Sequence, residues 1–205
     1  WDFTKLFMDE LGLPIVADND VNSFAACECN MGAGKKYKTY IVMTVGTGIG
    51  GAIVVNNKLW RGKDYNAGEI GRMLVDGVHW EKMASITALI KSAKLRELDI
   101  EEGKDVFDLY DQGDRVAQLV VGEFYRNLGK GIANLVYIFN PEAIIIGGGV
   151  SAREGFGNEI NAYADYYLVD GFQDTVDIIP AQFKNDGGIL GAYCNFIDRY
   201  GKGEE

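Results

Sequence analysis

A glycine-rich segment between two apolar stretches constrains the fold of this chain more than any other feature. The segment 45–51 reads VGTGIGG and separates the stretches KYKTYIVMTV and AIVVN. The residues Asn56 and Asn57 then lead into KLWRG. Strand-forming residues bounded by glycine or asparagine turns are typical of hairpins, so the sequence predicts a β-meander. Glycine N–H groups at such a turn can approach a phosphate closely, but a plain glycine-rich hairpin is an equally good interpretation.

The rest of the chain alternates between helical and strand patterns. A meander followed by such alternation is typical of the α/β class. The loop 62–81 has little periodicity and is interpreted as a functional loop. The predicted helices cover residues 2–11, 20–31, 81–96, 104–111, 113–139, 154–168 and 187–199, and further strands cover 15–18, 143–150 and 174–180.

Composition excludes several function classes. The net charge of −10 and the pI of about 4.6 disfavour a nucleic-acid partner, because the phosphate backbone is also negative. No apolar run approaches the roughly 20 residues that span a bilayer, so no membrane partner is expected. The three cysteines, Cys27, Cys29 and Cys194, cannot form a disulfide framework, which favours a reducing cytoplasm. With one histidine in the chain, no zinc site is expected, and the cysteines are interpreted as ordinary helix residues.

Two polar clusters are candidates for chemistry. The segment ADNDVN at 17–22 follows a predicted strand, where Asp20 could accept a proton from a substrate hydroxyl, although capping of the next helix is the simpler interpretation. The segment NAGEIG at 66–71 places Glu69 in a flexible loop, with Glu81 beyond it. Carboxylates bind sugar hydroxyls well because each oxygen accepts hydrogen bonds, but a solvated loop acid is the simpler interpretation of this motif taken alone.

Two further glycine clusters follow. In IIIGGGVS, the residues Gly147, Gly148 and Gly149 end a buried strand, where a flat base or a phosphate could lie on the backbone, or where the chain simply turns. The segment NDGGILGA at 185–192 opens the last helix and could flank an adenine pocket or act as a cap.

The order and spacing of these motifs resemble the ROK family of bacterial sugar kinases and sugar-responsive repressors, from about residue 13 to 197. The resemblance implies an actin-like, ribonuclease-H-like fold with a mixed sheet flanked by helices. It implies that Asp20 is the catalytic base. It also implies that Asn19, Glu69 and Glu81 contact the sugar, with Glu81 lying within the segment HWEKMAS. The transferring phosphate would contact Gly46, Thr47 and Gly48. The nucleotide would contact Gly147, Gly148 and Gly149.

The chain departs from the family in two places. Arg72 of AGEIGR stands where the family has a histidine that ligates zinc and touches sugar, and the CxCGxxGC zinc segment is absent. We therefore expect a zinc-free member with Arg72 near the sugar. The first phosphate motif, DxGGT, is also absent, so we expect that the N-terminal part is missing and that these residues alone are poorly active. We expect the chain to divide into three parts. Residues 1–36 are the rest of a small lobe and a hinge, and residues 37–186 are the large lobe. Residues 187–205 are a terminal helix that packs back toward the small lobe, followed by a tail.

The resemblance implies γ-phosphoryl transfer from ATP, with Mg²⁺, to a hexose or an N-acetylhexosamine. One alternative is a sugar-sensing transcriptional regulator of the same family, without turnover. Another is an acyl-phosphate enzyme of the same superfamily, although the pair Glu69 and Glu81 favours sugar. Because family members commonly dimerise, a homodimer is expected. Trp60 and Trp80 are candidates for its surface, although partial burial within the domain is the simpler interpretation.

Overall fold

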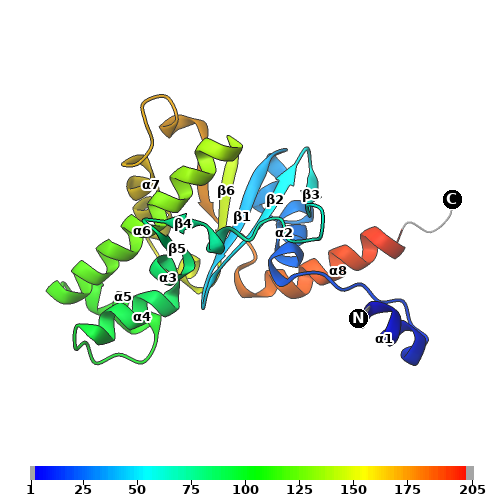
Figure 1. Cartoon of the computed structure of the whole chain (residues 1–205), viewed down its shortest axis with the longest axis horizontal. Helices are drawn as coiled ribbons and strands as arrows, with labels where there is room; N and C mark the ends of the chain where they lie inside the picture. The colour runs from blue at the N-terminus through cyan, green and yellow to red at the C-terminus, as the bar shows by residue number, and fades with distance from the viewer. Residues whose placement is uncertain (1–2, 202–205) are drawn as a thin grey trace.

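The computed structural model describes residues 3–201, apart from the side chain of Asn185. Its main sheet has five strands in the order β3-β2-β1-β6-β7. The pairs β1/β2 and β2/β3 are antiparallel, whereas β1/β6 and β6/β7 are parallel. The predicted meander and the α/β class are therefore confirmed (Figure 1). The strands are β1 Tyr40–Val45, β2 Ile49–Val55, β3 Lys58–Trp60, β6 Ala143–Gly147 and β7 Asp177–Pro180, and a separate hairpin pairs β4 Leu74–Val75 with β5 Val78–His79.

Helices cover both faces of this sheet (Figure 1). The pair α2 and α8 lies on one side, and the helices from α3 to α7 lie on the other. The α-helices are α1 Phe3–Leu11, α2 Asp20–Asn30, α3 Glu81–Ala84, α4 Ile86–Leu95, α5 Gly103–Asp111, α6 Arg115–Phe139, α7 Phe156–Asp165 and α8 Gly187–Tyr200. Short 3₁₀ turns are η1 Ala33–Lys36, η2 Ile70–Arg72, η3 Gly149–Ala152, η4 Gln173–Thr175 and η5 Lys184–Asp186.

The strands β1 and β6 are buried on both faces because each face has its own hydrophobic core. Along β1, Ile41 and Met43 contribute to the larger core with α6, whereas Tyr40 and Val42 contribute to the smaller core with α2. Successive strand residues point to opposite faces, so a strand covered on both sides needs an unbroken apolar run. This explains the continuous apolar patterns of KTYIVMTV and AIIIG.

Several predicted elements differ from the structure. The helix predicted at 81–96 is two helices, α3 and α4, because Ser85 between them is extended and caps α4. The helix predicted at 154–168 is shorter and covers Phe156–Asp165. Residues 15–18 form no strand, because this segment pairs with no other strand among the described residues and its polar end turns into α2. The strand predicted at 143–150 ends at Gly147, because Gly148 has a φ of 90° and turns the backbone. The strand predicted at 174–180 begins only at Asp177. The hairpin turn at Asn56 and Asn57 is confirmed, with φ values of 51° and 61°.

The two ends of the chain expose apolar surface. The helix α1 has no buried residue, and it extends away from the sheet near the C-terminal end of α8 (Figure 1). Phe3, Phe7 and Leu11 are exposed on α1, as are Ile189 and Tyr193 on α8. The division into lobes stays a prediction, and its residues 1–2 and 202–205 lie outside the described part of the chain.

The two tryptophans proposed for a dimer surface have different environments. Trp80 is completely buried, and its indole N–H donates to the carbonyl of Asn127 at 2.8 Å. It is therefore a core residue, because removing its large ring from water stabilises the fold. Trp60 on β3 is half exposed.

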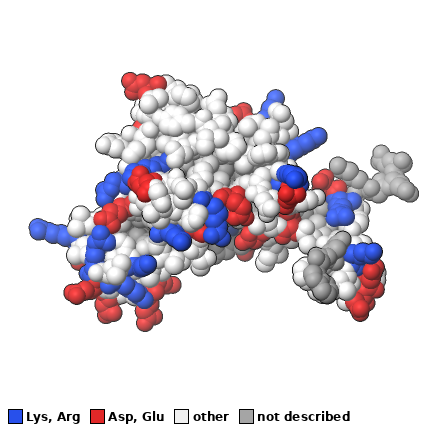
Figure 2. All heavy atoms as spheres, in the orientation of Figure 1, with Lys and Arg blue, Asp and Glu red and all other residues white. Residues whose placement is uncertain are grey.

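Acidic and basic side chains are interspersed on the face shown in Figure 2. The described residues on that face form no broad basic patch of the kind that a nucleic-acid backbone requires. Within residues 3–201, no helix is both long enough and apolar enough to cross a bilayer.

Candidate active site

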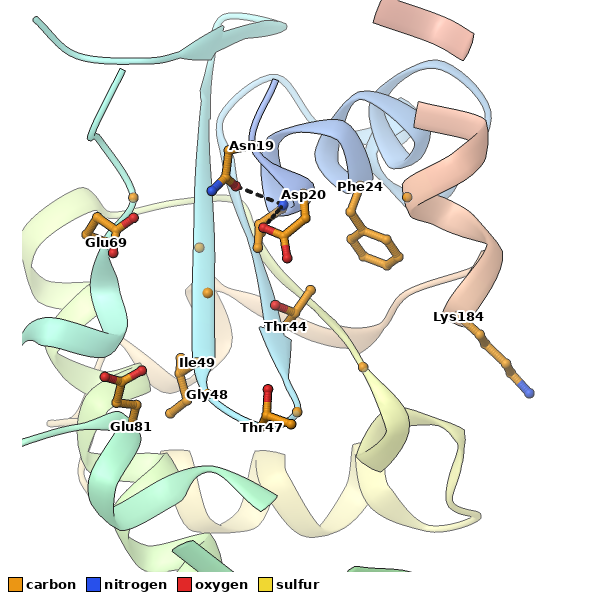
Figure 3. Close-up of a pocket in the computed structure, with 17 residues that line it drawn as sticks. Asn19, Asp20, Phe24, Thr44, Thr47, Gly48, Ile49, Glu69, Glu81 and Lys184 are labelled. Atoms are coloured by element: carbon orange, nitrogen blue, oxygen red, sulfur yellow. Dashed lines mark hydrogen bonds between the residues drawn. The ribbon is translucent and has the colours of Figure 1, made fainter. Parts of the chain in front are cut away.

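A cavity of about 470 Å³ lies beside the glycine-rich turn of the sheet (Figure 3). The turn between β1 and β2 forms its floor, and the first turn of α2 enters it from another side. Eight of the predicted site residues line this cavity: Asn19, Asp20, Gly46, Thr47, Gly48, Glu69, Glu81 and Gly148. Segments far apart in the sequence therefore meet at one place, as the motif order predicts.

Asn19 and Asp20 both cap α2 and face the cavity. The Oδ1 atom of Asn19 accepts hydrogen bonds from the N–H groups of Val21 at 2.8 Å and Asn22 at 3.2 Å. Oδ1 of Asp20 accepts the Val21 N–H at 2.9 Å. Its Oδ2 has no hydrogen-bond partner among the described residues, and the carboxylate points toward Thr44 and Thr47 (Figure 3). Capping thus uses one oxygen of Asp20 and leaves the other for a ligand.

The turn at 46–48 is held from outside by α4. The N–H of Ile86 donates to the carbonyl of Gly46 at 2.8 Å, and the hydroxyl of Thr87 donates to the carbonyl of Thr47 at 2.7 Å. A Cβ at Gly48 would lie 2.9 Å from Oε2 of Glu81, so glycine here also leaves room for that carboxylate. The turn is therefore fixed in position before any ligand arrives.

Glu69 and Glu81 line the same side of the cavity (Figure 3). Glu69 precedes η2, and Glu81 opens α3. Arg72 does not line the cavity. Its guanidinium pairs with Oε1 of Glu81 at 3.1 Å, and its side chain is 64% exposed. The structure therefore places Arg72 behind Glu81, as a partner of that acid.

The three glycines at the end of β6, Gly147 to Gly149, have three different surroundings. A Cβ at Gly147 would meet the ring of Phe24 at 2.5 Å, so this glycine serves packing. Gly148 lines the first cavity, and a Cβ there would lie 2.4 Å from the carbonyl oxygen of Val45. Gly149 lines a second cavity of about 560 Å³. This second cavity is also lined by apolar residues, including Ile86, Ile90, Phe107 and Val150.

The structure adds residues that the motifs did not single out. Lys184, Phe24 and Thr44 line the first cavity. Lys184 lies immediately before the segment NDGGILGA, which was the available signal. Arg153 lines the second cavity, where its guanidinium lies over the rings of Phe107 and Tyr110. Apart from Gly149, no predicted site residue lines that cavity, because its wall comes from separate segments.

The cysteines are all free thiols. Burial, together with the smaller effects of the neighbouring Glu28 and Cys194, raises the pKa of Cys27 to about 12. The thiol therefore stays protonated at neutral pH and is a poor nucleophile or metal ligand. Among residues 3–201, His, Cys, Asp and Glu side chains do not gather in threes where a metal ion could bind.

Comparison with known proteins gives the family context of this geometry. A family model described as the ROK family matches residues 1–199. A curated relative, a beta-glucoside kinase from Klebsiella pneumoniae, is 36% identical over 200 residues. That match covers 92% of this chain and 66% of the relative, so the chain spans about two thirds of the relative's length.

Solved structures agree with this match. A ROK family glucokinase from Streptomyces griseus, in complex with glucose and AMPPNP, has a TM-score of 0.82 and 32% identity, over 92% of this chain and 70% of that one. A putative N-acetylmannosamine kinase from Listeria monocytogenes has a TM-score of 0.85 and 32% identity, over 97% of this chain and 71% of that one. The predicted actin-like fold is confirmed.

Proposed function

We propose that this chain, which belongs to the ROK family, is the larger part of an ATP-dependent kinase that phosphorylates a sugar hydroxyl. One observation carries the proposal. The free carboxylate oxygen of Asp20 shares a cavity with the turn at 46–48 and with two further acids, Glu69 and Glu81. Phosphoryl transfer to a sugar needs a proton acceptor, a rigid turn with glycine N–H groups, and carboxylates that bind the sugar hydroxyls.

The mechanism follows from how these groups are held. Glu69 and Glu81 accept hydrogen bonds from sugar hydroxyls and orient the acceptor, while the amide of Asn19 keeps its N–H₂ group free for a further hydroxyl. Asp20 takes the proton of the attacking hydroxyl. Gly46, Thr47 and Gly48 receive the transferring phosphoryl group at a turn that α4 already holds. Positioning and electrostatic stabilisation supply most of the rate enhancement in this chemistry.

The two cavities suggest how the nucleotide lies. Gly148 lines the first cavity and its neighbour Gly149 lines the second, so a ligand crossing this backbone reaches both. We propose that the apolar second cavity receives the adenine base and that the phosphates extend over Gly148 toward the turn at 46–48. Gly147 acts indirectly, because it packs on Phe24.

Magnesium enters this proposal with the nucleotide. The described residues offer no cluster of three acids that would hold a metal ion by themselves. Mg²⁺ is commonly held by phosphate oxygens, waters and one or two carboxylates, and we propose Asp20, whose carboxylate points toward Thr44 and Thr47 in Figure 3, as one of them. When bound, the ion would neutralise charge on the phosphates.

Relatives narrow the sugar class. The names beta-glucoside kinase and glucokinase both describe a glucosyl acceptor, and we propose a glucosyl unit here, either free or in a β-glucoside. We also propose that the protein is cytoplasmic, because its cysteines are free, and that it forms a homodimer, because members of the family commonly do. A small lobe would cover the exposed apolar face of α1 and α8.

The test is a coupled ADP-release assay on the full-length protein with glucose, cellobiose, N-acetylmannosamine and fructose. We expect turnover with glucose or cellobiose. The variant Asp20→Asn keeps the cap to Val21 and should lower kcat by about 10²–10⁴-fold, with sugar affinity largely unchanged. Sugar binding without turnover by the wild type would favour the regulator alternative, and equal turnover by the variant would remove Asp20 as the base.

A further inference from the structure

The charges of the first cavity are divided between its two sides. Three carboxylates line it, those of Asp20, Glu69 and Glu81. Lys184 is the single Lys or Arg among the described lining residues. In Figure 3, Glu69 and Glu81 lie on one side, Asp20 lies between, and Lys184 lies on the opposite side with its amine directed away from the other labelled side chains, so that binding an anion in the cavity requires its flexible side chain to turn inward. The cavity therefore has an acidic side suited to hydroxyls and a basic side suited to an anion.

The loop that carries Lys184 is held at both ends by backbone hydrogen bonds. Ahead of it, the N–H of Ala181 donates to the carbonyl of Ile146 at 2.8 Å, which ties the loop to the end of the sheet. Behind it, the N–H of Gly187 donates to the carbonyl of Phe183 at 2.9 Å, where α8 begins. Lys184 itself has a φ of 32°, which is unusual for a residue with a side chain.

A buried carboxylate holds the same loop from the other side. Glu28 on α2 is completely buried, and its Oε1 accepts the N–H of Phe183 at 2.9 Å. Its Oε2 accepts the N–H of Ala33 at 2.8 Å. Both oxygens are therefore used by backbone N–H groups, one of them 155 residues away in the sequence. Burying a carboxylate is costly, and charge-assisted bonds of this kind offset that cost while fixing the loop.

We infer that Lys184 binds the phosphate chain of the nucleotide, and that Glu28 is a positioning residue that fixes the loop carrying it. The inference rests on the proposed function and adds a specific cation to it. A polyphosphate that enters a cavity with three carboxylates needs a positive partner. Lys184 supplies it on the side away from the sugar acids, and its flexible side chain reaches from a fixed backbone.

The test measures nucleotide affinity by calorimetry on the full-length protein, with Mg-AMPPNP and with adenosine as separate probes. Lys184→Gln should weaken Mg-AMPPNP by about tenfold, and Lys184→Arg by no more than about threefold, because a charged contact is lost in one and kept in the other. Adenosine has no phosphate, so its affinity should be the same in all three proteins. The matched control Lys91→Gln removes an exposed charge from α4, outside the cavity lining, and should change neither affinity.

Glu28→Gln tests the positioning role. A glutamine of the same shape offers one oxygen to two N–H donors, so one bond to Ala33 or Phe183 is lost. The variant should weaken Mg-AMPPNP by about threefold to tenfold and leave glucose affinity unchanged. Combined with Lys184→Gln, it should add little, because both act through one contact.

Each outcome decides the inference. Equal Mg-AMPPNP affinity of the wild type and Lys184→Gln would overturn it while leaving the kinase proposal intact. A matching loss of adenosine affinity would also overturn it, because the effect would not then involve phosphate. A wild type that binds no nucleotide would overturn both proposals together. Lys184 is exposed, so its variants should fold even where Glu28→Gln does not.

Discussion

Replacing Gly191 by alanine probes a close contact between two helices, α8 and α2. Gly191 lies on α8 where that helix packs against α2. A Cβ at this position would lie 1.6 Å from the carbonyl oxygen of Ser23 and 2.3 Å from its carbonyl carbon. Carbon and oxygen atoms that are not bonded need roughly 3.2 Å, so the helices must separate by roughly 1.5 Å. The obstacle is backbone, so no change of rotamer relieves it.

The expected cost follows from these distances. Overpacking costs about 1–3 kcal/mol, and a backbone obstacle belongs at the upper end of that range. Alanine recovers about 1 kcal/mol through its higher helix propensity. The free energy of unfolding of Gly191→Ala should therefore fall by about 2 kcal/mol. For a chain of this size, that loss lowers Tm by about 4–8 °C.

The assay is urea unfolding followed by far-ultraviolet circular dichroism, together with a thermal melt. Gly188 provides a matched control on the same helix, because a Cβ there would meet no atom within 4 Å. Gly188→Ala should stay within about 1 kcal/mol of the wild type. If the two variants proved equally stable, the close approach of α2 and α8 would not be a real constraint on the fold.

Two further perturbations address the site and the core. Arg72→Met should raise the KM for sugar by no more than about fivefold at unchanged kcat, because an exposed ion pair such as that with Glu81 contributes only about 0–1 kcal/mol. A fiftyfold rise in steady-state assays would instead mean that Arg72 touches the sugar. Burial raises the pKa of Cys27 from 9.0 in the unfolded chain to about 12 in the folded protein. The protonated thiol therefore contributes fully to the free energy of unfolding below pH 9, and this contribution is lost as the pH rises toward 12. The urea midpoint should therefore fall between pH 9 and 11, and Cys27→Ala should fall less steeply, whereas parallel curves for the two proteins would contradict this.

Local sequence signals predicted the parts of the fold that local chemistry decides. The turn at Asn56 and Asn57 needs positive φ values, which asparagine tolerates, so the meander was readable from the sequence. The strand prediction at 15–18 was wrong because an apolar segment forms a strand only when another strand lies beside it, and the local sequence does not show which segments will be neighbours. The boundary at Gly148 depended on a single backbone angle.

The candidate site was predictable to a similar extent. Asp20, Glu69 and Glu81 stood in motifs with a recognisable order, and the structure brings them to one cavity. The position of Lys184 in the first cavity and most of the wall of the second cavity arise only when distant segments meet, so the neighbouring motifs NDGGILGA and GGG gave only an indirect signal for them. Arg72 was placed near the sugar by its position in the motif, but the structure turns it toward Glu81.

The tether through Glu28 has a consequence for how this molecule moves. Asp20 is the first residue of α2. Near the other end of that helix, Glu28 accepts a hydrogen bond from the loop that carries Lys184. The helix α8 packs against the same helix. We therefore expect the proposed proton acceptor, Asp20, and the proposed phosphate-binding cation, Lys184, to move together. If the cavity opens for substrates, we expect the distance from Asp20 to the acids Glu69 and Glu81 to change more than the distance from Asp20 to Lys184. Fluorescent labels placed across that gap would change their separation during turnover, whereas labels on α2 and α8 would keep theirs.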